Sequence, residues 1–333
     1  MNLWSISGGR LIFSHPAKAV YWEVPDDFTM PSEALLNLAE YLLLKGLGVE
    51  VPQRGTRTFG TRNAVSYSGG VDSTAALALI PDPLPIYTQV ANPVGNHKLE
   101  NALLALADVN GIAIVTNSDE LAPLLGKSNR GFYGTGGFTV PAVLFADYYD
   151  IGVIADGNVL ETVYLYSRHG HGTQYTPRKY APILNRFKAA GIHYAMPCAG
   201  LTEVSTTLLA QGARYAMGCM RGEGGVPCGN CAKCYRKGAL QGRPIPSCAE
   251  SEKKLGKEVI PMLPSMLWAV KHKGLRHPIL DVLDKDIDWV DKWYSDSINL
   301  IPEHLRDYFL SQLRVHGIVT LDDDTAIRNW ISC

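Results

Sequence analysis

A glycine pair directly behind an apolar segment is the feature that most constrains the fold of this chain. Residues 64–67 read Ala-Val-Ser-Tyr, the glycines are Gly69 and Gly70, and a run rich in alanine and leucine begins at Ala75. The apolar segment predicts a buried strand and the later run predicts a helix, so the glycines lie in the turn between them. Two glycines let the backbone approach an anion closely, and the N-terminal end of a helix attracts negative charge. The turn therefore predicts a phosphate-binding loop.

Polar side chains complete this loop. The candidate nucleotide-binding residues are Ser68, Gly69, Gly70, Val71, Asp72, Ser73 and Thr74. We expect backbone N–H groups to surround the phosphates and the hydroxyl groups to add hydrogen bonds. The loop is not of the Walker type, because no Gly-Lys-Ser/Thr sequence follows. An ordinary turn between a strand and a helix is the alternative, and the Asp-Ser pair after the glycines argues against it.

The middle of the chain alternates between strand-like and helix-like segments. Helical runs such as 98–109 and 201–209 separate the strands, which we expect near 63–67, 85–90, 112–115, 151–155, 192–195 and 213–217. This alternation predicts right-handed βαβ crossovers and an α/β fold with a doubly wound parallel sheet. In such a sheet the phosphate loop lies beyond the carboxyl end of its strand, where ligands bind.

The patterns at the two ends differ from this middle part, residues 61–240. Residues 1–60 combine alternating apolar segments with a helical pattern at 32–47, which predicts a β-rich N-terminal cap. Its Ser7–Gly9 sequence also reads Ser-Gly-Gly, but the strand-like alternation that follows predicts a hairpin turn without a functional role. Residues 241–333 predict a helical C-terminal extension.

Amphipathic runs near 285–297 and 302–314 account for the predicted helices of that extension.

The chain as a whole carries 31 basic and 32 acidic residues, so its charge does not favour nucleic acid or an anionic membrane as a partner. A small-molecule substrate fits better. No basic region followed by a long apolar stretch begins the chain, and we expect a cytoplasmic protein. The oligomeric state stays open, a homodimer included.

Four of the seven cysteines crowd together as Cys219, Cys228, Cys231 and Cys234, with the spacing C-x8-C-x2-C-x2-C. Four thiolates suit a tetrahedral zinc ion, and Gly229 relieves backbone strain in the turn. Because four protein ligands leave no position for an activated water, the zinc would be structural. An iron–sulfur cluster, redox disulfides and unligated buried cysteines are the alternatives. The isolated cysteines are interpreted as buried small hydrophobic residues: Cys198, Cys248 and Cys333.

The Ser-Gly-Gly-x-Asp-Ser sequence of the loop resembles the PP-loop of the ATP pyrophosphatases, which adenylate a carboxylate or carbonyl oxygen and release pyrophosphate. The loop and the cysteine knuckle at 219–234 together resemble those of the 7-cyano-7-deazaguanine synthases of the queuosine pathway, the QueC family. This resemblance covers residues 63–240. Asn96–Glu100 and Met196–Glu203 are also similar to segments of this family. The resemblance implies a sheet of the HUP/PP-loop type and an ATP-dependent ligase that uses ATP, Mg²⁺ and structural Zn²⁺.

The chain departs from that family in three respects. Gly131–Phe138 replaces a Gly-Arg-Asn segment, a lysine common near Glu203 is missing, and residues 1–60 and 241–333 have no counterpart. These departures concern the substrate and leave the phosphate loop intact. We therefore expect ATP chemistry on a small-molecule carboxylate, of which a 7-deazapurine carboxylate is one candidate, with ammonia or an amine as the nucleophile.

The candidate catalytic residues are Asp72, Ser73 and Asp156. If ATP is split between its α and β phosphates, the loop backbone would hold the leaving pyrophosphate, with hydrogen bonds from Ser68 and Ser73. Mg²⁺ would neutralise the phosphates, held by Asp72 or Asp156. Asp72 and Ser73 are expected on the loop itself. For Asp156, which follows the predicted strand 151–155, an ordinary turn carboxylate is the alternative.

Two glycine-rich segments carry weaker signals. The Arg168–Lys179 loop concentrates cations that would close on phosphate or on the substrate carboxylate. Its His169 and His171 suggest a second metal, with a solvated loop as the alternative. Gly134–Gly137 predicts either backbone that approaches the substrate or a hinge.

Two other functions fit parts of the sequence. RNA thiolation uses relatives of this loop but requires a reactive cysteine near the nucleotide, and a zinc-bound tetrad is a poor source. A non-catalytic zinc-ribbon protein would bind nucleic acid in a salt-dependent manner, which the near-neutral charge does not favour. The sequence favours an ATP-dependent ligase or amidating enzyme in which ammonia or an amine attacks an acyl-adenylate.

Overall fold

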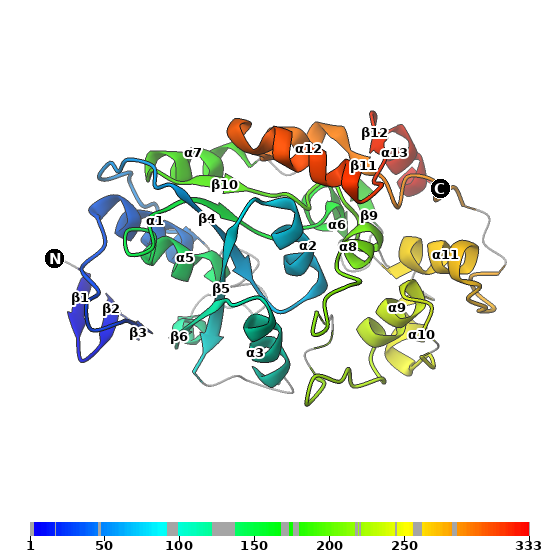
Figure 1. The fold of residues 1–333 in the computed structure, drawn as a ribbon, viewed down its shortest axis with the longest axis horizontal. Helices are drawn as coiled ribbons and strands as arrows, with labels where there is room; N and C mark the ends of the chain where they lie inside the picture. Colours follow the sequence, from blue (N-terminus) through cyan, green and yellow to red (C-terminus); the bar gives the residue numbers. More distant parts are fainter. Residues whose placement is uncertain are drawn as a thin grey trace.

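An eight-stranded mixed sheet forms the centre of the protein, and helices lie against it (Figure 1). The computed structural model describes residues 3–16, 18–45, 48–91, 99–121, 137–167, 173–175, 180–216, 219, 221–243, 245–255, 262–281 and 285–332. The predicted mixed α/β architecture is confirmed. Of the helices in these residues, none combines the length and the apolar composition needed to cross a membrane.

Five parallel strands make up one part of the sheet. They are β4 (Arg62–Tyr67), β5 (Pro83–Val90), β6 (Ile112–Thr116), β7 (Ile151–Ala155) and β10 (His193–Ala195). Their spatial order is β6-β5-β4-β7-β10, so β4 comes first in sequence and lies in the middle. The chain proceeds from β4 to one side through β5 and later to the other side through β7. Such a reversal of strand order opens a crevice at the carboxyl ends of the strands.

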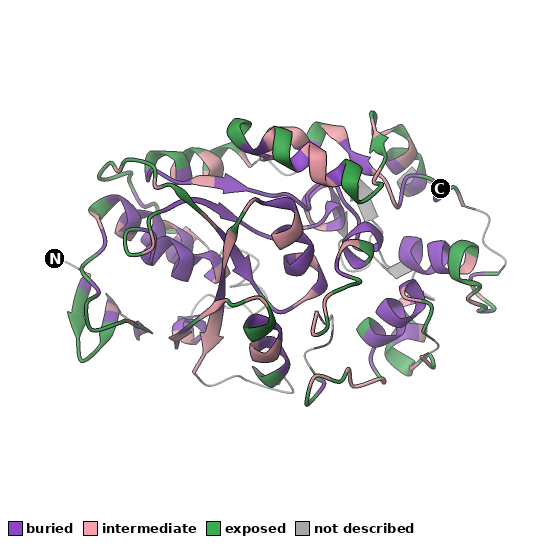
Figure 2. Cartoon of the chain, in the orientation of Figure 1, coloured by how far each residue is buried: buried purple, intermediate pink, exposed green. Residues whose placement is uncertain are grey.

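Neighbouring residues of β4 face opposite sides of the sheet, and helices cover both sides. Val65 belongs to an apolar cluster with residues of α2 (Val71–Leu79) and α12 (Arg306–Val315). Ala64 belongs to the cluster that contains residues of α1 (Glu33–Leu44), α5 (Val140–Leu144) and α7 (Ala181–Ala189). Successive side chains of a strand point to opposite faces, and apolar contacts on both sides are typical of a strand buried on both faces. In Figure 2 the buried colour covers all of β7 and most of β4, while the two ends of β5 are intermediate.

The N-terminal strands continue this sheet. β1 (Trp4–Ser7), β2 (Arg10–His15) and β3 (Lys18–Glu23) form an antiparallel meander, and Trp22 of β3 pairs with Thr116 of β6. The predicted hairpin turn is confirmed, because Gly8 and Gly9 have φ angles of +56° and +69°, as a tight hairpin requires. The ring of Trp22 is fully buried, which fixes the meander on the core.

The remaining elements surround the sheet or extend it at the C-terminus. They are α3 (Leu99–Asp108), η2 (Ser118–Leu121), η4 (Gly137–Thr139), α6 (Leu160–Val163), β8 (Leu165–Ser167), β9 (Thr173–Tyr175), α8 (Glu203–Leu209), α9 (Ala232–Leu240), α10 (Ala249–Leu255), α11 (Met262–Lys273), β11 (Trp293–Tyr294), η5 (Ser295–Leu300), η6 (Glu303–Leu305), β12 (Thr320–Leu321) and α13 (Thr325–Ser332). The predicted helix near 302–314 is confirmed by η6 and α12.

Two predicted elements were wrong. In place of a strand at 213–217, residues 211–215 form turns, and Tyr215 packs beside α3 instead of entering the sheet. In place of a helix at 285–297, the chain forms turns, the short strand β11 and a 3₁₀ helix. There Trp293 pairs with Thr320, and the N–H of Tyr294 donates to the carbonyl of Gly200 at 2.9 Å. Tertiary contacts thus override the local helical pattern.

Arg57 connects the segment before β4 with three other parts of the chain. Its guanidinium donates to the carbonyl oxygens of Ala146, Ile151 and Gly191 at 3.0, 3.1 and 2.9 Å, and its Nε lies 2.6 Å from Asp147 Oδ1. Its side chain is 8% exposed. Buried carbonyl groups need such a donor, because they cannot reach water.

We expect Arg57→Met to lower the free energy of unfolding by about 3 kcal/mol, since it removes three hydrogen bonds to carbonyls and the ion pair with Asp147, although the carbonyl of Ala146 keeps the N–H of Ile151. Urea unfolding followed by circular dichroism measures the change. Arg10→Met is the matched control, because Arg10 is about half exposed in a 3.9 Å surface pair with Glu23. The control should cost less than about 1 kcal/mol, and equal losses in the two variants would contradict the assigned role.

Candidate functional site

The loop between β4 and α2 has the backbone geometry of an anion-binding turn. Strand β4 ends at Tyr67, and α2 begins at Val71. Gly69 adopts a φ of +70°, and a Cβ atom there would lie 2.8 Å from Cα of Ala102 in α3. Only glycine therefore fits this position. The first N–H groups of α2 have no acceptor within the helix and can bind an anion.

Hydroxyl groups fix the shape of this loop from within. The hydroxyl of Ser73 accepts a hydrogen bond from the N–H of Ser68 at 3.1 Å and donates to the carbonyl of Gly70 at 3.0 Å. Ser68 Oγ lies 3.0 Å from Ser73 Oγ, and Thr74 Oγ1 donates to the carbonyl of Gly70 at 2.9 Å. Contrary to expectation, Asp72 and Ser73 lie in the first turn of α2, and Ser73 is buried. The hydroxyl of Ser73 therefore shapes the cradle.

Asp72 is the half-exposed carboxylate at the start of α2. Its Oδ1 accepts a hydrogen bond from Thr206 Oγ1 at 2.6 Å and lies 4.0 Å from Lys237 Nζ. Both contacts use the same oxygen, so Oδ2 is the carboxylate oxygen left for a cation within the described part of the chain. Carboxylate oxygens are the ligands that Mg²⁺ prefers.

Asp156 lies close to the phosphate loop but is fully buried. A Cβ atom on the next residue, Gly157, would lie 2.7 Å from the backbone N of Ser73, so this turn packs directly on α2. Asp156 Oδ1 accepts from the N–H of Asn158 at 3.0 Å, and Oδ2 accepts from the hydroxyl of Tyr194. Burial raises the pKa of Asp156 to about 6, although these hydrogen bonds oppose the shift. Both oxygens are occupied, which favours the turn carboxylate over a magnesium ligand.

The four clustered cysteines come together in space. Their Sγ atoms all lie within 4.8 Å of one another, with Cys219 to Cys228 at 3.4 Å and Cys231 to Cys219 at 3.8 Å. Tetrahedral Zn–S bonds of about 2.3 Å need sulfurs about 3.8 Å apart, so the cluster has the size of a zinc site. The N–H groups of Arg221 and Cys234 donate to sulfur at 3.4 Å, as thiolate ligands require. These residues could hold a metal such as zinc.

A buried group of charges lies between the cysteines and the phosphate loop, and sequence reasoning did not find it. Arg236 of α9 contacts both carboxylate oxygens of Glu203 in α8, at 2.6 and 2.7 Å, and Lys237 Nζ lies 2.8 Å from Glu203 Oε1. The three side chains are 7–8% exposed. Although burial opposes ionisation, these partners hold the pKa of Glu203 well below its usual range. The signal in the sequence was the Arg-Lys pair at two and three positions after the last clustered cysteine.

Glu161 of α6 is a second buried carboxyl next to this group. Its Oε1 accepts a hydrogen bond from the N–H of Glu203 at 3.0 Å, and its Oε2 has no hydrogen-bond partner among the described residues. Burial raises the pKa of Glu161 to about 8. The carboxyl is therefore mostly protonated at neutral pH.

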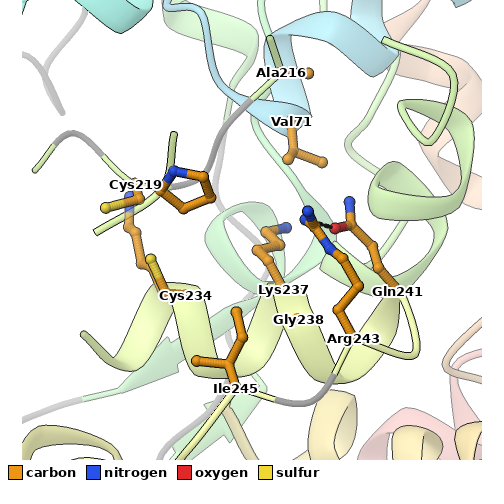
Figure 3. Close-up of a pocket in the computed structure, with 11 residues that line it drawn as sticks. Val71, Ala216, Cys219, Cys234, Lys237, Gly238, Gln241, Arg243 and Ile245 are labelled. Atoms are coloured by element: carbon orange, nitrogen blue, oxygen red, sulfur yellow. Dashed lines mark hydrogen bonds between the residues drawn. The ribbon is translucent and has the colours of Figure 1, made fainter. Parts of the chain in front are cut away.

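A small pocket opens between the start of α2 and α9, with a cavity volume of about 30 Å³. Figure 3 shows the side chains of Lys237 and Arg243 extending from the α9 side toward Val71. Lys233 also lines the pocket, and among its described lining residues there is no carboxylate. Lys237 is already paired with Glu203, so Lys233 and Arg243 are the lining cations that could bind an anionic ligand. A zinc ion bound by four thiolates would carry a net negative charge and would offset part of theirs.

Several predicted residues lie outside the described part of the chain. These are Asn96–Lys98, Gly131–Gly136, and both 168–172 and 176–179 of the Arg168–Lys179 loop. Between residues 172 and 176 of this loop, Thr173–Tyr175 form β9, which pairs with β8. Among the isolated cysteines, Cys198 is fully buried as predicted, Cys248 is only half-buried, and Cys333 lies outside the described residues.

Comparison with known proteins gives a match over the cysteine segment. Residues 183–260 match a family described as "Family of unknown function (DUF6395)". This segment contains Glu203, the clustered cysteines and Lys237, but it does not include the phosphate loop. No curated protein matches the chain.

The purified protein should contain one zinc ion per chain, and Cys231→Ser should lower the melting temperature by at least about 5 °C, because a closed Cys₄ shell contributes folding energy. Elemental analysis and a thermal melt provide the two measurements. Cys248→Ser is the control, since Cys248 lies outside the cluster, and it should retain the metal. A metal-free and fully stable wild type would contradict the zinc assignment.

Glu161 should make the protein less stable as the pH rises. Its folded pKa is about 8 and its ordinary value 4.5, so between these values the folded state binds more protons than the unfolded state. Wild-type stability then falls with increasing pH by up to about 1.4 kcal/mol per unit from this group. We expect Glu161→Gln to remove most of this slope in urea unfolding between pH 5 and 8.

Glu250→Gln is the control for that experiment. Glu250 is partly exposed, and its hydrogen bond with Lys254 lowers its pKa, so it stays ionised across this range. The control should keep the wild-type slope. Parallel pH profiles for the wild type and Glu161→Gln would show that Glu161 is ionised in the folded protein.

Proposed function

We propose that this chain is an ATP-dependent ligase or amidating enzyme that adenylates a carboxylate and releases AMP and pyrophosphate, similar to the QueC family. The observation that carries the proposal is the loop Ser68–Thr74, with its left-handed glycine, its internal hydroxyl bonds and the open N-terminus of α2. Phosphates are the ligands that such a turn binds best.

The position of the loop supports a doubly wound sheet of the PP-loop type. The loop follows β4, the middle strand of the parallel part. The chain continues through β5 on one side of β4 and later through β7 on the other side. Helices cover both faces of these strands. Nucleotides bind in the crevice at such a reversal of strand order.

The side chains around the loop support a division of roles. Backbone N–H groups of Gly69 to Asp72 would hold the leaving pyrophosphate, and Asp72 Oδ2 would hold Mg²⁺ directly or through water. When bound, Mg²⁺ would neutralise charge on the phosphates. Asp156 and Tyr194 hold the neighbouring turn against α2.

The cationic pocket supports a carboxylate as the acyl substrate. Lys233 and Arg243 line it beside the paired Lys237, and Val71 places it directly beside the phosphate loop. The pocket is too small for a whole substrate, so only the carboxylate group of a molecule such as a 7-deazapurine carboxylate would reach it. There it would lie near the nucleotide, and proximity of the two reactants accelerates adenylation. Ammonia or an amine would then displace AMP from the acyl-adenylate, and in a nitrile-forming reaction a second ATP would dehydrate the amide.

RNA thiolation is the alternative that one observation favours. Cys198 Sγ lies 3.5 Å from the backbone carbonyl of Asp72, so a cysteine does lie near the loop. However, Cys198 is fully buried, and burial raises the pKa of its thiol well above the usual value, with Asp72 and Asp156 adding to the shift. A thiol that stays protonated is a poor nucleophile, and this disfavours the alternative.

Turnover should yield AMP and pyrophosphate, because the loop would hold the β and γ phosphates as a leaving unit. Incubation of the protein with Mg-ATP, a 7-deazaguanine carboxylate and ammonium, followed by chromatography of the nucleotides and a pyrophosphate assay, tests this. ATP–pyrophosphate exchange that depends on the carboxylate would show the adenylation step separately. ADP and orthophosphate as products would refute the proposal.

Variants of the loop serve to locate this activity. Asp72→Ala and Ser73→Ala should each lower turnover about a hundredfold and leave the circular dichroism spectrum unchanged. Ser14→Ala on the exposed side of β2 is the control and should be fully active. Full activity in both loop variants would place the catalytic site elsewhere.

A further inference from the structure

Lys237 connects the helix behind the cysteines with the carboxylate of the phosphate loop. Its ammonium group donates to Thr207 Oγ1 at 2.8 Å, lies 2.8 Å from Glu203 Oε1 and lies 4.0 Å from Asp72 Oδ1. The side chain is 8% exposed, so these groups replace water around the charge. The contact joins α9 to the start of α2.

Two neighbouring threonines of α8 hold the two ends of this contact. Thr206 donates to Asp72 Oδ1 at 2.6 Å, and Thr207 accepts from Lys237. Since Thr206 and Thr207 belong to one rigid helix, they hold the carboxylate and the ammonium group side by side. Asp72 is therefore positioned from α8 and from α9 together.

The charges of the neighbouring groups explain how Lys237, a second buried cation beside Arg236, is accommodated. Arg236 already pairs with both oxygens of Glu203, and this pair is neutral. Removing an ammonium group from water costs several kcal/mol, so the additional charge of Lys237 needs another anion nearby. Asp72 supplies a carboxylate 4.0 Å from Lys237, and the charges of Glu203, Arg236, Lys237 and Asp72 then sum to zero.

We propose that Lys237 is a positioning residue for Asp72, which makes nucleotide affinity depend on how α9 and the cysteine knuckle are packed. The proposal rests on the proposed function, because it assigns Asp72 to Mg-ATP. Cys234 and Lys237 lie three positions apart in α9, so one sulfur of the candidate metal site and the ammonium group share one turn of helix. A shift of the knuckle therefore moves the partner of Asp72.

A double-mutant cycle on the full chain tests this link, with Lys237→Met, Asp72→Asn and the combined variant. Lys237→Met leaves Glu203 paired with Arg236, so the variant should fold. We expect it to raise the Kd for Mg-ATP in calorimetry about tenfold in the wild-type background and less than twofold in the Asp72→Asn background. Lys237→Arg should recover part of the affinity, because it keeps the charge. Lys271→Met, in an exposed pair with Asp288, is the control and should bind like the wild type.

The outcomes separate this link from the proposed function. An equal tenfold loss in both backgrounds would overturn the link, since Lys237 would then act on the nucleotide without Asp72. An unchanged Kd in Lys237→Met would also overturn it. If the wild type binds no Mg-ATP, the proposed function fails, and urea unfolding of the same four proteins still tests the link: coupled effects of the two substitutions support it, and additive effects overturn it.

Discussion

The buried carboxylate of Glu203 is the interaction on which the arrangement of the candidate site depends. It binds Arg236 through both oxygens and also pairs with Lys237, so three charges from α8 and α9 are fixed relative to one another. Removing one partner of such a group leaves an uncompensated charge in a medium that cannot solvate it, which makes the geometry rigid. The contact fixes α9 against α8, while apolar residues of α9 pack on α11.

The phosphate loop adds a different kind of constraint, made mainly of backbone. Gly69 fits against Ala102 because it has no side chain, and the hydroxyls of Ser73 and Thr74 converge on the carbonyl of Gly70. These bonds form within seven residues and need no distant partner. The hydroxyl bonds of the loop are thus local, while the packing of Gly69 on Ala102 and the charges around the loop depend on long-range contacts.

This difference explains what could be predicted from the sequence. The strands of the parallel part, the hairpin at Gly8 and Gly9, and the grouping of the four cysteines follow from local patterns, and the structure contains them. The charge cluster could not be predicted, because Glu203 and Arg236 meet only after α8 and α9 have packed together. Burial of Asp156 depends in the same way on Tyr194 of a later strand. The failed helix at 285–297 shows tertiary pairing overriding a local pattern.

The sequence separation within the site has a consequence for synthesis of the protein. Asp72 and Thr206, which share a hydrogen bond, are 134 positions apart, and Lys237 follows later still. The chain emerges from the ribosome N-terminus first, so the phosphate loop is exposed well before the residues that hold its carboxylate have been made. A nascent chain that ends before α9 therefore has the loop but not the surroundings of Asp72. The site is completed only when the cysteine segment has left the ribosome and folded.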